Sequence, residues 1–133
     1  MSYLLLKNFY SETASTYSLE NSASFNCIIE LDPDHEMYKG HFPQMPVVPG
    51  VCLIQIVKEI LMLKFQKELI LAQGTNIKFL LLINPQKTKI FRIDFTVKQV
   101  DDMFEVNANF VNNDITFTKF KGKFKTVRDF FNE

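Results

Sequence analysis

The sequence predicts a single α+β domain over residues 1–133, in which an antiparallel sheet curls around one long buried helix. Three observations support this fold class. One central segment is apolar on nearly every side of a helical projection, the segments after it alternate apolar and polar residues, and the length suits one core without disulfide or metal support. No segment repeats at the period of a solenoid protein.

The first elements are a connecting segment and a strand. Residues 11–24 are rich in Ser, Thr and Asn and predict a connecting segment with a short strand or edge piece inside it. Residues 25–31 place apolar side chains at odd positions, which is the period-two pattern of a half-buried strand. Asp32, Pro33 and Asp34 then predict a turn.

The central helix is predicted over residues 51–66. Its polar residues form only a narrow stripe, so the helix is expected to be buried almost all round. Pro49 suits the helix start because its fixed φ and missing N–H cost nothing there. Ala72, Gln73 and Gly74 predict a break before the next strand.

The rest of the chain is expected to be mainly strand. Asn112, Asn113 and Asp114 form a predicted turn before the last strand. The apolar parity of that strand changes along its length, which indicates a bulge near Thr118. The predicted strands span residues 75–83, 90–97, 104–110 and 115–125.

Composition excludes several classes of protein. Fifteen Lys plus Arg balance fifteen Asp plus Glu, so no general attraction to nucleic acid or to an anionic membrane is expected. No stretch approaches the length of a membrane span, and Met1–Tyr10 carries no cleavage signal, so a cytoplasmic protein is expected. Fourteen Phe without Trp suggest an aromatic core or an acyl-binding groove. Cys27 and Cys52 are expected to be buried thiols without a chemical role.

Common signatures of nucleotide binding, serine hydrolysis and zinc binding are absent. Asp32, Asp34, His35 and Glu36 form an acidic cluster, but a solvated turn explains it better than a metal site. No metal and no cofactor are therefore expected.

The most informative segment is GHFPQMPVVPGV, residues 40–51, with two glycines, three prolines and His41. It resembles the GHFPxxPVxPGV stretch of the FabZ and FabA families of 3-hydroxyacyl-acyl carrier protein dehydratases, matched at every fixed position. The resemblance implies a hotdog fold. The run LDPDHEMYKGHFP, with PGVCLIQI after it, is most similar to the dehydratase-like hotdog proteins that accompany polyene pigment synthesis.

The resemblance implies roles for residues in and after this segment. Dehydration of a 3-hydroxyacyl thioester needs a base, an acid and a donor to the thioester carbonyl. The base is expected to be His41, since imidazole titrates near neutral pH. Backbone N–H groups at the helix start suit the carbonyl, and Gly50 allows a close approach of substrate. The expected substrate-binding residues are Phe42, Pro49, Gly50 and Val51.

Gln55 departs from the family, which carries Glu or Asp there as the acid, contributed across a dimer interface. Gln55 orients a hydroxyl but cannot donate a full proton at neutral pH. Glu59 follows one helical turn later, about 5.4 Å along the axis, which is too far to replace that acid. Glu59 is expected to be a solvated or partner-facing residue.

Three functions remain open. The first is a dehydratase acting on acyl thioesters of acyl carrier protein, linked through phosphopantetheine, in fatty acid or polyene synthesis. The second is a hotdog thioesterase in which Gln55 positions water, and the third is a catalytically silent acyl-binding or partner subunit. A homodimer is expected, with a heterodimer of two hotdog proteins as the alternative. Lysines that share one face of the last strand are candidates for docking the acidic carrier: Lys119, Lys121, Lys123 and Lys125.

Overall fold

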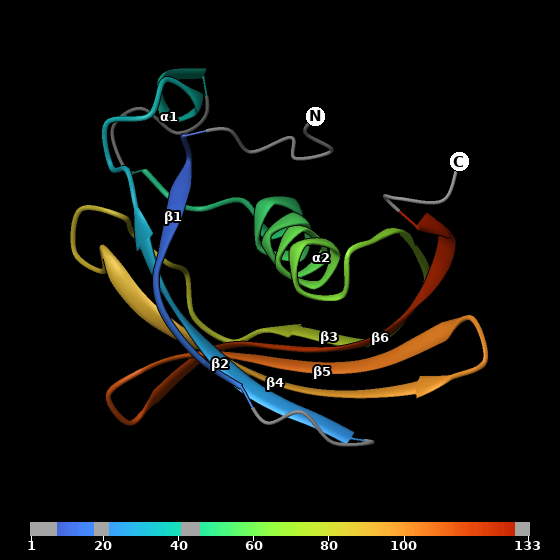
Figure 1. Cartoon of the computed structure of the whole chain (residues 1–133). Helices are drawn as coiled ribbons and strands as arrows, with labels where there is room; N and C mark the ends of the chain where they lie inside the picture. Colours follow the sequence, from blue (N-terminus) through green and yellow to red (C-terminus); the bar gives the residue numbers. More distant parts are fainter. Residues whose placement is uncertain (1–7, 18–21, 41–45, 130–133) are drawn as a thin grey trace.

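The protein forms one curved antiparallel sheet with a helix against its concave face (Figure 1). The structure is a computed structural model that describes residues 8–17, 22–40 and 46–129. The elements in chain order are β1 (Tyr10–Tyr17), β2 (Ser22–Leu31), α1 (Met37–Gly40), α2 (Gly50–Phe65), β3 (Lys67–Phe79), β4 (Ile90–Val100), β5 (Met103–Asn112) and β6 (Ile115–Asp129). The predicted α+β class and antiparallel sheet are confirmed.

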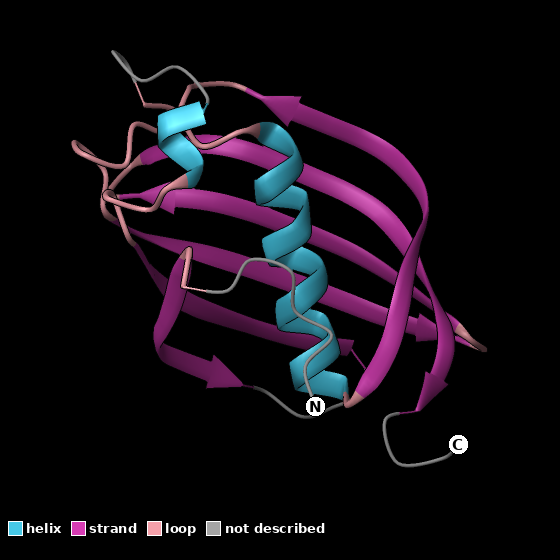
Figure 2. Ribbon diagram, turned by 90° about the horizontal axis from the view of Figure 1, so that it is seen from above, coloured by secondary structure: helices cyan, strands magenta, loops and turns pink. Residues whose placement is uncertain are grey.

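The strands follow the spatial order β1-β2-β4-β5-β6-β3, and every neighbouring pair is antiparallel. Strands β1 and β3 therefore form the two edges. Seen from above, α2 crosses the strands, and the short α1 lies near one end of it (Figure 2). The sheet order brings β3, which follows α2 directly, next to the last strand of the chain.

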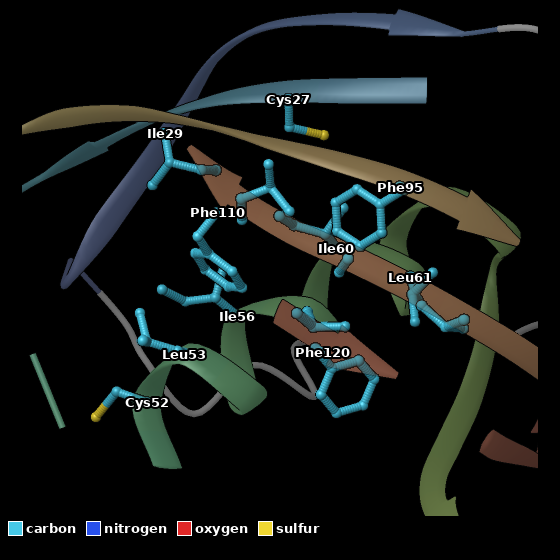
Figure 3. Packing of buried hydrophobic residues seen from close by; sticks show 14 of the residues in the cluster. Cys27, Ile29, Cys52, Leu53, Ile56, Ile60, Leu61, Phe95, Phe110 and Phe120 are labelled. Carbon is cyan, nitrogen blue, oxygen red and sulfur yellow. The ribbon is translucent and has the colours of Figure 1, made fainter. Parts of the chain in front are cut away.

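The core lies between α2 and the concave face of the sheet. Ile56 and Ile60 of α2 point into the same space as Phe95 and Phe110 of the strands (Figure 3). Alternation along β4 and β5 places every second side chain in this core, as the period-two pattern predicts. The fully or nearly fully buried residues of these two strands are Phe91, Ile93, Phe95, Val97, Phe104, Val106, Ala108 and Phe110.

Helix α2 begins and ends close to the predicted limits. Pro49 is its N-cap residue, with extended backbone and no side-chain cap. Gln66 ends the helix in the left-handed conformation, at φ 55°, and its N–H bonds to the carbonyl of Met62. The expectation of a long helix buried almost all round is not confirmed: α2 has 16 residues, and Val51 is 75% exposed.

One prediction about the strands is borne out in part, and another is wrong. The short strand or edge piece expected inside residues 11–24 is present as the edge strand β1, which spans residues 10–17 because it pairs with β2 along its length, with one bulge between Glu12 and Ala14. Strand β3 begins at Lys67, and the predicted break at residues 72–74 lies inside it. Its pairing with β6 shifts register beside Gln73 and Gly74, so local irregularities absorb these residues within a continuous strand.

The bulge predicted near Thr118 is confirmed. Phe110 of β5 pairs with Thr118 and Val111 pairs with Thr116, so Phe117 is the additional residue in β6. The predicted turn before β6 is confirmed as well, with Asn113 at φ 55°. The bulge allows both Phe117 and Phe120 to be buried although their spacing breaks the alternation.

Candidate active site

The candidate active site surrounds the start of α2. His41 and Phe42, the predicted base and one predicted substrate-binding residue, lie outside the described residues. The chain resumes at Pro46, and the N–H of Val48 donates to the carbonyl of Ile83 at 2.9 Å. This hydrogen bond joins the segment before α2 to the segment after β3, so two distant parts of the chain meet at the helix start.

The helix start leaves backbone donors available. The N–H groups of Cys52 and Leu53 both bond to the carbonyl of Pro49. Among the described residues, the N–H groups of Gly50 and Val51 make no backbone hydrogen bond, as helix geometry requires of the first turn. Pro49 therefore acts in the structure as the residue that begins the helix.

An apolar cavity of about 400 Å³ opens beside this helix start. Two of the predicted substrate-binding residues, Gly50 and Val51, line it, whereas Pro49 does not. The sequence pattern did not identify the other side of the cavity, because residues 79–82 belonged to the strand predicted over residues 75–83, whereas β3 ends at Phe79. The remaining lining residues are Val48, Leu53, Ile54, Phe79, Leu81, Leu82 and Ile83.

Gly50 is in close contact with Phe79. A Cβ atom at Gly50 would lie 2.7 Å from the Cζ atom of Phe79, which is closer than two carbons can approach. The absence of a side chain at Gly50 therefore leaves space for the Phe79 ring. The sequence did not predict this contact. Phe79 is 50% exposed, so the ring forms an outer wall of the cavity.

Gln55 belongs to a hydrogen-bonded group of three side chains. Its Nε2 donates to Oε2 of Glu59 at 3.0 Å, and the hydroxyl of Tyr10 donates to Oε1 of Glu59 at 2.9 Å. The expectation that Glu59 is solvated or faces a partner is wrong, since it is only 1% exposed. The third member, Tyr10, is the residue just before the predicted connecting segment 11–24. No local pattern pointed to it.

Burial and Glu59 control the ionisation of the neighbouring groups. Burial first, and the Glu59 carboxylate second, raise the pKa of the Tyr10 hydroxyl far above its ordinary range. The same two causes, in the same order, raise the pKa of the Cys52 thiol. Both groups therefore remain protonated at neutral pH, and Tyr10 is a hydrogen-bond donor to Glu59.

The acidic cluster before the motif forms a turn. The N–H of Asp34 donates to Oδ1 of Asp32, and the N–H of Met37 donates to Nδ1 of His35. Within the ranges that the structure describes, no group of three or more His, Cys, Asp or Glu side chains is placed to hold a metal ion. Among the same residues, no helix combines the length and apolar character needed to cross a membrane.

The predicted lysine row lies on the convex face of the sheet. Lys119, Lys121 and Lys125 are exposed and Lys123 is half-buried, while Phe120 and Phe124 between them are buried on the helix side. At one end of the row Lys119 pairs with Lys78, which precedes Phe79 of the cavity wall. The lysine row therefore ends near the rim of the cavity, although it lies on the convex face of the sheet and the helix packs against the concave face.

Comparison with known proteins identifies a family. The family model ApeI-like, described as ApeI dehydratase, matches residues 17–123. No curated protein matches the chain. Many solved structures are similar to it in fold, and two of them are compared with it in detail. An uncharacterised protein from Erwinia carotovora subsp. atroseptica has a TM-score of 0.65 and 21% identity, and the match covers 90% of this chain and 96% of that protein.

The second similar structure is the dehydratase heterocomplex ApeI:P from Xenorhabdus doucetiae. Its TM-score is 0.58 at 20% identity, and the match covers 86% of this chain and 96% of that one. At this identity the likeness concerns the fold alone. It supports the description of the antiparallel sheet and its helix as hotdog-like.

Proposed function

The chain belongs to the ApeI-like dehydratase family, and we propose that it acts in the dehydration of 3-hydroxyacyl thioesters carried by acyl carrier protein, in polyene or fatty acid synthesis. One observation carries the proposal. The family match over residues 17–123 includes both the segment 40–51 and the helix start that borders the apolar cavity. No cofactor enters this proposal.

The cavity suits the acyl part of such a substrate. Its volume of about 400 Å³ and its lining by Val, Leu, Ile and Phe side chains match what an acyl chain buries. The free N–H groups of Gly50 and Val51 lie at the positive end of α2, where a thioester carbonyl would accept hydrogen bonds. A substrate in this position would place its acyl chain against Phe79 and Leu82.

In the proposed chemistry His41 removes a proton from C2 of the acyl group. The C3–O bond then breaks, the C2–C3 double bond forms, and the hydroxyl leaves as water after it receives a proton. Gln55 binds and orients this hydroxyl. It cannot supply the proton, so His41 in its protonated form, solvent or a partner subunit supplies it.

A partner subunit is part of the proposal. The similar dehydratase from Xenorhabdus doucetiae is a heterocomplex, which favours pairing of this chain with another hotdog protein. A partner with a carboxyl group at the acid position would complete the site that His41 begins. Self-association is the alternative, and it would leave Gln55 in both sites.

Product analysis tests the function. The chain, alone and with a candidate partner, is incubated with a 3-hydroxyacyl thioester and with a saturated acyl thioester of acyl carrier protein. Enoyl product supports the dehydratase, and free acid from either substrate would identify a thioesterase instead. Absence of both products, together with retained binding of acyl carrier protein, would identify a catalytically silent subunit.

Two substitutions test the residue roles. Gln55→Glu restores a carboxyl at the acid position, and turnover is expected to rise by up to about 10²-fold to 10⁴-fold, the usual contribution of a general acid. His41→Ala is expected to abolish dehydration in both backgrounds. Gln55→Leu is the matched control, since it removes hydrogen bonding without adding a proton donor. Unchanged turnover in Gln55→Glu and full activity in His41→Ala would contradict the mechanism.

A further inference from the structure

A carboxylate lies inside the protein beside the proposed site. Glu59 accepts hydrogen bonds at both oxygens, from Tyr10 of β1 at 2.9 Å and from Gln55 at 3.0 Å. A buried carboxylate is costly unless it is hydrogen-bonded, so these two donors stabilise it. The contact also ties the edge strand β1 to the third turn of α2, although the two residues are 49 positions apart in the chain.

This arrangement determines which end of the Gln55 amide faces outward. An amide has a donor end, NH₂, and an acceptor end, the carbonyl oxygen. Tyr10 and Gln55 both donate to Glu59, so the NH₂ end of Gln55 is the end that faces it. Among the residues that the structure describes, Oε1 of Gln55 has no hydrogen-bond partner.

Gln55 is also close to the cavity along the helix. It is half-buried and follows Val51, a cavity-lining residue, by one helical turn. Because the NH₂ end is held by Glu59, an oxygen acceptor remains for a group that enters from the helix start. A substrate hydroxyl is a donor of the kind that this oxygen binds.

We infer that Glu59 and Tyr10 are positioning residues, which hold the carbonyl oxygen of Gln55 outward so that it recognises the hydroxyl group of an acyl substrate. The inference rests on the proposed function for the place of the substrate. Tyr10 fixes the carboxylate of Glu59, Glu59 fixes the amide of Gln55, and Gln55 accepts a hydrogen bond from the hydroxyl. The group of three therefore selects hydroxyacyl over unsubstituted acyl substrates.

Binding of two unreactive ligands to the full-length chain tests the selection. The ligands are the amide analogue of a 3-hydroxyacyl-pantetheine and the matching analogue without the hydroxyl. The wild-type chain is expected to prefer the hydroxyl ligand by about threefold to tenfold, as one hydrogen bond of this kind allows. Glu59→Gln is expected to remove the preference, because two amides pair through either end and Oε1 of Gln55 is no longer held outward.

Further variants separate positioning from a structural role. Tyr10→Phe is expected to reduce the preference, and the exchange Gln55→Glu with Glu59→Gln is expected to restore it, because the new carboxylate accepts from the hydroxyl. Lys58→Gln is the matched control on the same helix, and its preference should equal that of the wild type. A preference that survives in Glu59→Gln would overturn the inference.

The side-chain amide resonances of Gln55 give a readout that needs no substrate. In ¹⁵N-edited NMR spectra they are expected to move in Glu59→Gln and in Tyr10→Phe, and to stay in place in Lys58→Gln. Resonances that do not move in Glu59→Gln would overturn the positioning role. If both ligands bind the wild type equally, hydroxyl recognition is overturned while the proposed function stands. If neither ligand binds, the proposed function is overturned with it.

Discussion

At the scale of single residues, burial controls the ionisable side chains around the core. It is the main cause that raises the pKa of the Cys27 thiol and of the Tyr38 hydroxyl, as it is for Cys52 and Tyr10. Groups with pKa values raised in this way stay protonated at neutral pH. Because thiolates rather than thiols are the reactive form, the two buried thiols are expected to be poor nucleophiles.

These shifts predict that the protein loses stability in alkali. The unfolded chain releases thiol protons from about pH 8.5 and tyrosine protons from about pH 10, whereas the folded chain retains them. The unfolded state then binds fewer protons than the folded state, so the free energy of unfolding decreases as pH rises. Each fully shifted group contributes up to about 1.4 kcal/mol per pH unit. Urea unfolding between pH 7 and pH 10.5 measures the slope.

The double variant Cys27→Ala and Cys52→Ala separates the two kinds of group. Its slope between about pH 8.5 and pH 10 is expected to be shallower than that of the wild type, while the steeper loss that begins near pH 10 remains. Only the slopes are compared, because each truncation also removes buried volume and lowers stability at every pH. Equal slopes in both proteins would show that the thiols ionise alike in the folded and unfolded states.

At the scale of single elements, Gly122 and Gly50 differ in what an added side chain would meet. A Cβ at Gly122 in β6 would lie 2.7 Å from the backbone oxygen of Gln73 and 2.8 Å from the buried ring of Phe120. Both neighbours are restrained, because Gln73 pairs with Lys123 of β6 and the Phe120 ring is buried. Gly122→Ala is therefore expected to lower the free energy of unfolding by about 1–3 kcal/mol, as overpacking does.

Gly50→Ala is the matched control. Its Cβ would meet only the far end of the Phe79 ring, which is half-exposed and has space to turn outward. The expected change in the free energy of unfolding is below about 1 kcal/mol, since a helical backbone at this position accepts alanine without strain. Urea unfolding of both variants measures the difference. An equal decrease in the free energy of unfolding would mean that the backbone of β3 at Gln73 gives way as easily as the Phe79 ring.

The lysine row of β6 predicts where an acidic carrier docks. Lys119 lies at the end of the row near Phe79, beside its cross-strand partner Lys78 of β3, whereas Lys123 and Lys125 lie at the far end. Replacement of Lys78 and Lys119 by Ser is expected to weaken binding of acyl carrier protein severalfold at low salt, and less at high salt, because exposed charges are screened. Binding is measured by titration calorimetry at two ionic strengths.

Replacement of Lys123 and Lys125 by Ser provides the comparison. It removes the same net charge from the same face, and binding is expected to change less because this end is farther from the cavity rim. If both pairs weaken binding equally, net charge rather than a local surface attracts the carrier. If neither pair changes binding at low salt, the row only keeps the sheet face solvated.

At the scale of the whole molecule, an apolar patch continues from the edge strand to the cavity. Phe79, Leu80, Leu81 and Leu82 are each about half-exposed or more, and Val51 of α2 lies on the other side of the same cavity. Contiguous apolar patches beside an unpaired strand edge are typical of surfaces that bind another protein. This patch is therefore the place where a second hotdog subunit is expected to pack.

A charge in the patch is expected to weaken association. Leu82→Lys should shift the protein toward smaller species in sedimentation velocity at micromolar concentration, alone or with its partner, without loss of helix signal in circular dichroism. Ile115→Lys, at the β5–β6 hairpin, is the control because Ile115 is an exposed apolar residue too, at 48% against 71% for Leu82, and lies outside the patch. An unchanged distribution of species in Leu82→Lys would exclude the patch as the interface.

Sequence patterns alone predicted most helices and strands, because the alternation and turn signals that mark them involve residues close together in the chain. Alternation identified β2, β4 and β5, and the change of parity identified the bulge at Phe117. Pro49 correctly predicted the start of α2, because the fixed φ of proline is a property of that residue alone and needs no distant partner. The segment 40–51 pointed to the family that the comparison identified.

Tertiary structure decided what depends on residues far apart in the chain. Strand β1 exists because β2 supplies its hydrogen bonds, and β3 continues through residues 72–74 because β6 accommodates the irregular register. The sequence predicted a solvated or partner-facing Glu59. The fold instead buries it beside Tyr10, which lies 49 positions away in the chain. Periodicity shows which side of a helix or strand is apolar. Only the fold determines which buried polar group meets which partner, and that pairing sets the free-energy cost of burying the group.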